Sequence, residues 1–267
     1  MKHTYFLSII FMLVVPILSN HTDTVSADSY PPCVAEKPEL IERCAEIEQR
    51  ILSSTLRIEI DLWLLEDKDQ SRYRSISSKG HGTVINGNHL LTHNHFQLPA
   101  HEIPVNDDDG QLATLTLLRA DGRRLWRGHL AEIKVAFQAS ESLLLEFAAE
   151  NSRPFFEALG VPALDFSVPT LSSIAPGTAV AQINWDKQQA FVQWTQITAV
   201  DTTGDTPIVR LADCIVTGAS GGGMFVDGFH LGNNWLLQKS CDGTTPHGAD
   251  YRSTVALNTF DLLSATN

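Results

Sequence analysis

The feature that most constrains the fold is a long succession of short strand-like segments, which begins near residue 55 and continues toward the end of the chain. Residues 56–65 (LRIEIDLWLL) alternate like a strand, and Asn86-Gly87 and Asp121-Gly122 are strong hairpin-turn signals between further apolar segments. Later segments of this kind are residues 141–147, 178–185, 190–200, 207–212, 222–238 and 253–257. Short strands at this spacing, with turn residues between them, predict an all-β sandwich or barrel.

The segment before these strands has a different period. Between Pro38 and Leu52, apolar residues recur at three- and four-residue steps, while acids and bases occupy the other face. This pattern predicts a short helix. It is compatible both with an integral part of the folded protein and with a pro-peptide.

The first 27 residues have the form of an export signal. Lys2 supplies a positive start, an apolar run follows from Tyr5 to Leu18, and Val25-Ser26-Ala27 offers small residues at the usual cleavage spacing. The run is shorter than the roughly 20 residues that span a bilayer, and Pro16 interrupts it. We predict cleavage after Ala27 and a secreted or periplasmic protein without stable membrane insertion; an uncleaved anchor is the alternative.

Residues 149–169, near the middle of the chain, lack a clear strand pattern and could link two barrels. Four parts are therefore predicted. They are a signal peptide at 1–27, an N-terminal helical segment at 28–54, a first β-barrel at 55–152 and a second β-barrel at 153–267.

The chain contains four cysteines, and an even number in an exported chain suggests two disulfides with three possible pairings. The local pairing, Cys33–Cys44 with Cys214–Cys241, is favoured. Eleven residues of straight helix rise about 16 Å, whereas the Cα atoms of a disulfide lie within about 7 Å. Pro38 resolves this difference, because it can start the helix and let Cys33 fold back onto it.

Glycines surround Ser220 in the sequence CIVTGASGGGMF, residues 214–225. A serine nucleophile needs a base to accept its proton and backbone N–H groups directed at the developing oxyanion. Gly218 lets the backbone turn so that its N–H and that of Ser220 point the same way, and the later glycines let a substrate backbone approach. An ordinary Gly/Ser turn of a β protein is the alternative interpretation.

His95 lies at the end of a predicted strand, in HLLTHNHF, far upstream of Ser220. This order, histidine first and serine last, is one of several known routes to the same catalytic geometry. Three segments then resemble those of a trypsin-like (chymotrypsin-fold) serine protease, nearer the bacterial branch of HtrA-type and glutamyl endopeptidases. GHGTVINGNHLLTHNHF resembles the family's GsGxvI…xxlLTxxHv, ESLLLEF resembles DxALLxx, and GASGGGMF resembles GxSGGPLx.

The resemblance implies an all-β fold of two antiparallel six-stranded β-barrels of chymotrypsin type, with the active site in the cleft between them. It also implies the roles of the site residues. Ser220 would attack a carbonyl, His95 would accept its proton, and the N–H groups of Gly218 and Ser220 would form the oxyanion hole. A disulfide between Cys214 and Cys241 would flank the nucleophile, as in the digestive branch.

The chain departs from the family pattern at several positions. Glu141 stands where the family has an aspartate, and one extra methylene shifts its carboxylate. A lost acid is one alternative, and an acid on the loop after His95 is another: Asp107, Asp108 or Asp109. Ala219 replaces the aspartate that pairs with a new N-terminus in the digestive enzymes, so no activation by that route is expected. Asp213 is interpreted as a solvated loop residue and not as a specificity determinant.

These features together predict a secreted serine endopeptidase that hydrolyses peptide bonds through a Ser/His/acid triad and an acyl-enzyme intermediate. Its partner would be a protein or peptide substrate, and no cofactor and no metal ion are implied. The formal net charge of −12 argues against a nucleic-acid partner.

Two alternatives from other classes remain. The first is a trypsin-like fold that has lost catalysis and binds a partner, and the substitution at Glu141 is its motive. The second is a His-ligated metallo-hydrolase, because five histidines fall between residues 81 and 101: His81, His89, His93, His95 and His101. His93 and His95 form an H-x-H pair, but the Asp-His pair that usually follows in such zinc sites is missing.

Overall fold

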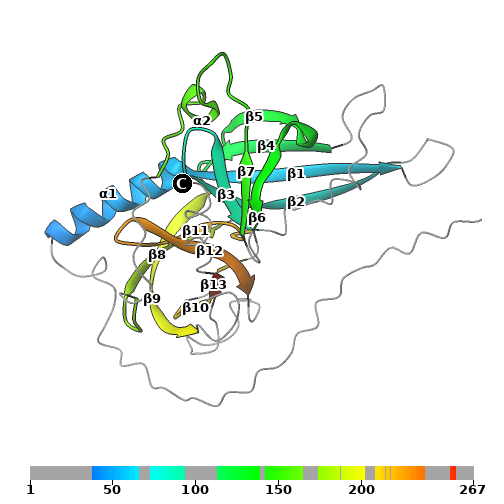
Figure 1. The fold of residues 1–267 in the computed structure, drawn as a ribbon. Coiled ribbons are helices and arrows are strands. Elements are labelled where there is room, and N and C mark those ends of the chain that lie inside the picture. The colour runs from blue at the N-terminus through cyan, green and yellow to red at the C-terminus, as the bar shows by residue number, and fades with distance from the viewer. Residues whose placement is uncertain are drawn as a thin grey trace, which may run out of the picture.

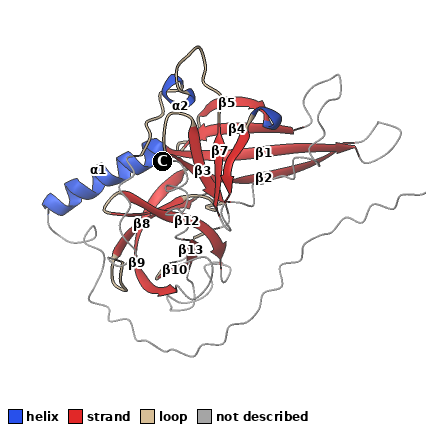
Figure 2. Ribbon diagram, in the orientation of Figure 1, coloured by secondary structure: helices blue, strands red, loops and turns tan. Residues whose placement is uncertain are grey.

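The computed structural model describes residues 38–65, 73–93, 113–138, 142–164, 174–186, 188–201, 208–213, 215–216, 218–237 and 253–256. In this part of the chain an N-terminal helix precedes two antiparallel β units (Figure 1). Strands β1 to β7 form the first unit and β8 to β13 the second (Figure 2). The all-β class predicted from the sequence is confirmed.

Helix α1 (Pro38–Ser54) runs directly into strand β1 (Thr55–Leu65). Ile51 faces the protein and is fully buried, whereas Ile41 on the outer face is 52% exposed. The Oγ1 of Thr55 donates a hydrogen bond of 2.8 Å to the carbonyl of Ile51 and ties the last helical turn to the strand. The predicted helix and the strand after it are therefore confirmed.

The first unit is a seven-stranded antiparallel sheet in the order β5-β4-β1-β2-β3-β7-β6. Its strands after β1 are β2 (Tyr73–Val84), β3 (His89–His93), β4 (Ala113–Arg119), β5 (Arg124–His129), β6 (Lys134–Gln138) and β7 (Ser142–Glu146). Both predicted hairpin turns are confirmed, one between β2 and β3 and the other between β4 and β5. In the second turn Gly122 has a φ of +84°, which glycine adopts readily.

The strand count of six predicted for this unit is wrong. Two strands were expected in residues 111–137, but the short 3-10 helix η3 (Leu130–Glu132) interrupts this stretch, so that β6 begins directly after it. The first half of β2 is also a strand that the pattern did not predict. Residues 73–81 (YRSISSKGH) are too polar to alternate clearly, and pairing with β1 gives them strand geometry.

The second unit is a closed antiparallel barrel in the order β10-β13-β12-β11-β8-β9. Its strands are β8 (Ala179–Trp185), β9 (Ala190–Asp201), β10 (Ile208–Leu211), β11 (Gly223–Val226), β12 (Phe229–Leu237) and β13 (Ser253–Ala256). Asp227 and Gly228 form the tight turn between β11 and β12, with φ angles of +51° and +81°. Ser220 lies just before β11, on the loop that enters the barrel from β10.

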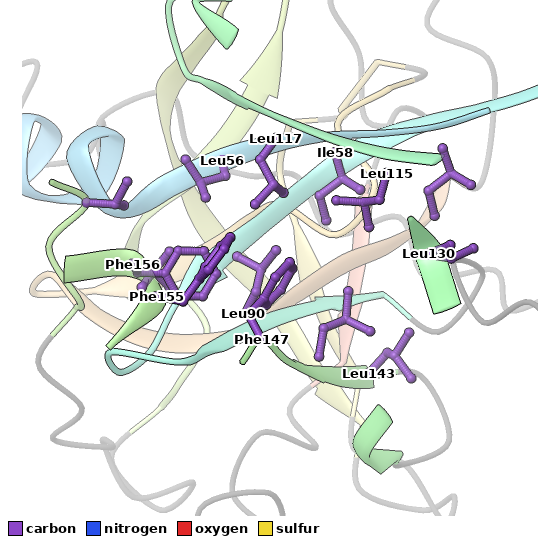
Figure 3. Close-up of a cluster of buried hydrophobic side chains, with 14 of the residues drawn as sticks. Leu56, Ile58, Leu90, Leu115, Leu117, Leu130, Leu143, Phe147, Phe155 and Phe156 are labelled. Carbon is purple, nitrogen blue, oxygen red and sulfur yellow. The ribbon is translucent and has the colours of Figure 1, made fainter. Parts of the chain in front are cut away.

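The core of the first unit is a cluster of fully buried side chains (Figure 3). Leu56 and Ile58 of β1 lie beside Leu115 and Leu117 of β4. Phe155 and Phe156, from the short helix α2 (Phe155–Ala158), close one end of the cluster, and the ring of Phe147 stacks on Phe155 with centroids 4.7 Å apart. Helix α2 lies within the stretch interpreted as a linker, so this part of the linker packs into the first unit.

The predicted signal peptide and three of the four cysteines, Cys33, Cys214 and Cys241, lie outside the described residues, so the export signal and both disulfides stay predictions. The predicted boundary between the two barrels also stays a prediction. Cys44 is described and is buried in α1, with 6% of its surface exposed. Neither helix in the described part of the chain is long and apolar enough to cross a membrane.

Candidate active site

The loop around Ser220, residues 215–222 without the undescribed residue 217, is called the serine loop below. Three of its N–H groups are used internally or by β12. Ala219 donates to the carbonyl of Val216 at 3.1 Å, Gly222 donates to that of Ala219 at 3.0 Å, and Gly221 donates to that of Asn234 at 2.7 Å. These bonds hold the loop in a tight turn with Ser220 partly exposed at its surface.

The N–H of Val216 donates to the Oδ1 of Asn184 at 3.1 Å. The N–H groups of Gly218 and Ser220 are the two that the sequence predicts to bind an oxyanion. Among the described residues, neither group donates to a backbone carbonyl. Gly218 has a φ of +103°, a conformation that a side chain would strain, so glycine is required there. The two N–H groups predicted to bind an oxyanion thus have no backbone acceptor within the described chain.

The serine loop is joined directly to the first unit. The N–H of His81, on β2, donates to the carbonyl of Ser220 at 2.8 Å, and the Oγ1 of Thr92, on β3, donates to the carbonyl of His81 at 2.6 Å. A Cβ on Gly221 would collide with the His81 carbonyl and with Thr92 Oγ1, and would lie 3.2 Å from the backbone nitrogen of His93. Glycine at position 221 therefore allows β3 and the serine loop to approach closely.

A buried polar group also connects β3 and β7 to the second unit. His93 pairs with Ser142 across these strands. Asn233, on β12, donates through Nδ2 to the Oγ of Ser142 at 3.1 Å and to the carbonyl of Thr92 at 3.4 Å. The Oδ1 of Asn233 accepts from the Nε2 of His230 at 3.2 Å. Asn233 is fully buried, so these bonds compensate for the water that its amide has lost.

The side chain of His81 contacts the serine loop as well. Its Nδ1 lies 2.9 Å from the carbonyl oxygen of Gly218. A carbonyl oxygen only accepts, so Nδ1 carries the proton and donates. Burial lowers the pKa of His81 to about 4, the hydrogen bond to Gly218 opposes this change in part, and the positive charge of Arg57 adds to it. The ring is therefore neutral near pH 7.

An aromatic platform lies under the serine loop. Trp185, at the end of β8, packs with Ile215 and the fully buried methyl of Ala219. The ring centroids of Trp185 and His81 are 5.4 Å apart. The guanidinium of Arg57 lies 4.3 Å from the centroid of the Trp185 ring and forms an ion pair with Glu59. The apolar surroundings of Ala219 leave no place for the carboxylate that digestive enzymes carry at this position.

Among the predicted site residues, Ser220 and Gly218 lie together on the serine loop. His95, Glu141 and the three alternative acids Asp107, Asp108 and Asp109 lie outside the described residues, so their roles stay predictions. Sequence reasoning missed His81 and Asn233 as residues of this site. A possible signal for Asn233 was its place in a strand that is otherwise largely apolar, FHLGNNWLL.

The histidine-rich stretch serves several separate purposes in the part of the chain that is described. His89 contacts Asn86 Oδ1 through Nδ1 at 2.7 Å within the β2–β3 turn, whereas His81 contacts the serine loop. No group of three or more His, Cys, Asp or Glu side chains that could hold a metal ion occurs among the described residues. Asp213 is exposed, and its backbone N–H donates to Thr195 Oγ1 at 3.1 Å.

Comparison of the sequence with protein-family models and with curated proteins finds no match. The structure, however, resembles solved structures. The crystal structure of Deg5 is similar with a TM-score of 0.54 and 14% identity, covering 85% of this chain and 95% of that one. The HtrA-type protease AlgW with a tripeptide has a TM-score of 0.54 and 16% identity, covering 83% of this chain and 62% of that one. The trypsin-like, HtrA-type fold suggested by the sequence is thereby confirmed as the fold of the chain.

Proposed function

We propose that the protein is a serine endopeptidase in which Ser220 is the nucleophile, His95 the general base and Glu141 the acid that orients the base. The observation that carries this proposal is the close approach of the serine loop to β2, to which it is hydrogen-bonded, and to the end of β3. Three separate features meet there: the carbonyl of Ser220, the backbone of His81 and the hydroxyl of Thr92.

Chain connectivity supports the pairing of Ser220 with His95. His95 follows His93, the last residue of β3, by two positions, and two residues of chain span at most about 7 Å. The backbone nitrogen of His93 in turn lies beside Gly221, the residue after the nucleophile. This spacing favours a meeting of the imidazole and the hydroxyl across the junction of the two units.

The same reasoning supports Glu141. This residue directly precedes Ser142, which pairs with His93 and is held by Asn233. Its place in the chain, one position before this pair, is the reason to propose it as the acid beside His95. The extra methylene of glutamate, relative to aspartate, is the reason to test Asp107, Asp108 and Asp109 beside it.

In the proposed reaction the Ser220 hydroxyl attacks the carbonyl carbon of the scissile peptide bond while its proton passes to His95. The N–H groups of Gly218 and Ser220 bind the resulting oxyanion. Collapse of this intermediate breaks the C–N bond, the leaving amine takes the proton from His95, and an ester remains on Ser220. Water then hydrolyses the ester through the same steps, so no cofactor or metal ion is required.

The proposal extends to the site of action. The predicted signal peptide and the predicted disulfides, Cys33–Cys44 and Cys214–Cys241, both suit a secreted or periplasmic enzyme. The substrate would be a protein or an unstructured peptide that reaches the junction between the two units.

The test uses the mature chain, a fluorophosphonate probe and a peptide library derived from a proteome. We expect labelling and cleavage by the wild type, neither in Ser220→Ala, and loss of labelling in His95→Ala. Glu141→Ala should lose more activity than a variant with all of Asp107, Asp108 and Asp109 changed to asparagine. A folded wild type that neither labels nor cleaves would overturn the proposal and favour a catalytically inactive fold that binds a partner. Activity abolished by a chelator but not by the probe would favour a metallo-hydrolase instead.

A further inference from the structure

We propose that His81 is a positioning residue for the oxyanion hole: its imidazole Nδ1–H holds the carbonyl of Gly218 and thereby fixes the peptide between the two N–H groups that bind the oxyanion. This inference rests on the proposed hydrolysis at Ser220. It adds to that function a residue of β2, in the first unit, that acts on a loop of the second.

The peptide between Gly218 and Ala219 is held at both of its polar ends. Its carbonyl accepts from His81 Nδ1 at 2.9 Å, and its N–H donates to the carbonyl of Val216 at 3.1 Å. The N–H of Gly218 lies on one side of this peptide and the N–H of Ser220 on the other. Fixing the plane of the central peptide restricts the direction in which both neighbouring N–H groups point.

An external constraint is needed here because of the residue type. Glycine populates positive and negative φ about equally, so its peptide rotates more readily than that of any other residue. Gly218 has a φ of +103°, and a Cβ added there would lie only 3.0 Å from the ring of Trp185. Without the bond to His81, the described surroundings leave this carbonyl without a hydrogen-bond donor.

His81 is unusually well held for this task. Only 1% of its surface is exposed, its ring lies against Trp185, and its own N–H and carbonyl are bonded to Ser220 and Thr92. Residue 81 thus contacts the segment from Gly218 to Ser220 twice, once through its backbone and once through its side chain. Among the described residues its Nε2 has no hydrogen-bond partner, so that the bond to Gly218 is the one hydrogen bond of the ring within this part of the chain.

The retention of an incompletely paired buried imidazole is itself informative. A buried polar atom without a partner costs stability, and an apolar side chain would avoid that cost. A donor at the Nδ1 position is what an imidazole supplies here and an aliphatic side chain does not. This observation favours a role in the geometry of the site over a role in packing.

The experiment compares two variants of nearly equal shape, His81→Asn and His81→Leu. Asparagine keeps an N–H donor near the place of Nδ1, whereas leucine has none. Loss of one oxyanion-hole donor typically lowers kcat about 10²–10³-fold. We therefore expect His81→Leu to lower kcat at least about 10-fold with KM changed less than about 3-fold, and His81→Asn to recover most of that loss.

Leu115→Ala is the control for a general loss of stability, because Leu115 is fully buried and belongs to a different apolar cluster from Ile215 and Ala219 of the serine loop. It should lower the melting temperature without the same change in kcat. Two results would overturn the proposal: unchanged kcat in His81→Leu, or equal losses in the leucine and asparagine variants. If His81→Leu does not fold, His81→Gln replaces it, because its amide lies one carbon farther from the backbone and misplaces the donor.

Hydrogen exchange separates this proposal from the proposed function. Exchange in the segment from residue 215 to residue 223 should be faster in His81→Leu than in wild type and near wild type in His81→Asn, whether or not the protein cleaves peptides. A wild type without activity but with this exchange pattern would refute the hydrolase and retain the role of His81 in the loop. Identical exchange in all three proteins would refute the role of His81.

Discussion

The two β units complete their apolar cores in different ways. The first unit is closed by residues that follow its last strand almost directly, with Phe155 and Phe156 of α2 packed onto the sheet. The second unit is covered by α1, which precedes the first strand of the other unit. Ile51 of α1 packs with Ala181 and Phe225, from β8 and β11.

Polar contacts reinforce the attachment of α1 to the second unit. The Nε1 of Trp194, on β9, donates to Glu48 Oε1 at 2.7 Å, and Arg50 donates to the carbonyl of Gly228 in the β11–β12 turn at 2.7 Å. The position of α1 in the sequence therefore does not show which unit it packs against. The helix continues into β1 of the first unit, but its buried face serves the barrel that carries Ser220, which favours an integral helix over a removable pro-peptide.

The largest effect is expected from the local closure of the first unit. Phe156→Ala should destabilise the protein by about 3–5 kcal/mol, because it removes a fully buried ring and leaves a cavity. Urea unfolding measures this change. Val135→Ala, at a side chain that is 50% exposed, is the control and should stay within about 0.5 kcal/mol of wild type. A loss of less than about 1 kcal/mol in Phe156→Ala would mean that α2 does not close the core.

The remote closure of the second unit should be nearly as important. Ile51→Ala should cost about 3 kcal/mol, and hydrogen exchange should accelerate in β8 and β11, which contact Ile51. Ile41→Ala lies on the same helix but at an exposed position, so it controls for helix propensity. Equal stabilities for the two variants would show that α1 is dispensable for the barrel and would revive the pro-peptide interpretation.

The difference between local and remote contacts also explains what the sequence could and could not predict. Helix α1, strand β1 and the turn at Asn86-Gly87 depend on local periodicity and turn chemistry, and they were predicted correctly. The polar half of β2 was missed because its strand geometry comes from pairing with β1, which is not a local property. The split between β5 and β6 was missed because one turn of 3-10 helix leaves almost no signal in the sequence.

The candidate site divides in the same way. Ser220 and Gly218 could be proposed from the sequence because a nucleophile and its oxyanion donors are expected close together in the chain. His81 and Asn233 contact partners 137 and 91 residues away, at Gly218 and Ser142, so no local pattern could reveal their roles. The packing of α1 against the second unit was unpredictable for the same reason.

One buried histidine in each unit provides a comparison through pH. Burial lowers the pKa of His81 in the first unit to about 4 and that of His230 in the second to about 3. Both are neutral in the folded state, whereas each takes up a proton near pH 6.5 when unfolded. The stability that depends on these two neutral rings is therefore fully present above about pH 6.5 and falls as the pH drops toward the folded pKa. At pH 5 the expected loss in the free energy of unfolding is about 2 kcal/mol for each histidine.

Unfolding free energies at pH 7.5 and pH 5 measure this loss in wild type, His81→Asn and His230→Asn. Each variant lacks one titrating ring, so each should show a smaller difference between the two pH values than wild type does. If the unfolding free energy of one variant changes with pH as much as that of wild type, the histidine replaced in that variant does not contribute to the pH dependence.

The smallest effect is expected from the polar attachment of α1. Trp194→Phe keeps most of the aromatic surface but removes the Nε1 donor to Glu48, and both side chains are partly exposed. Water can replace part of the lost bond, so the expected cost is about 1 kcal/mol by chemical unfolding, well below that of Ile51→Ala. Glu48→Gln should cost still less, because its amide oxygen still accepts the bond. Comparing these two variants with Ile51→Ala separates the polar from the apolar contribution to the attachment of α1. If Ile51→Ala loses more free energy of unfolding than they do, burial of the apolar face is the main contribution. A loss in Trp194→Phe equal to that in Ile51→Ala would instead mean that the hydrogen bond, and not the apolar face of the helix, holds α1 to the second unit.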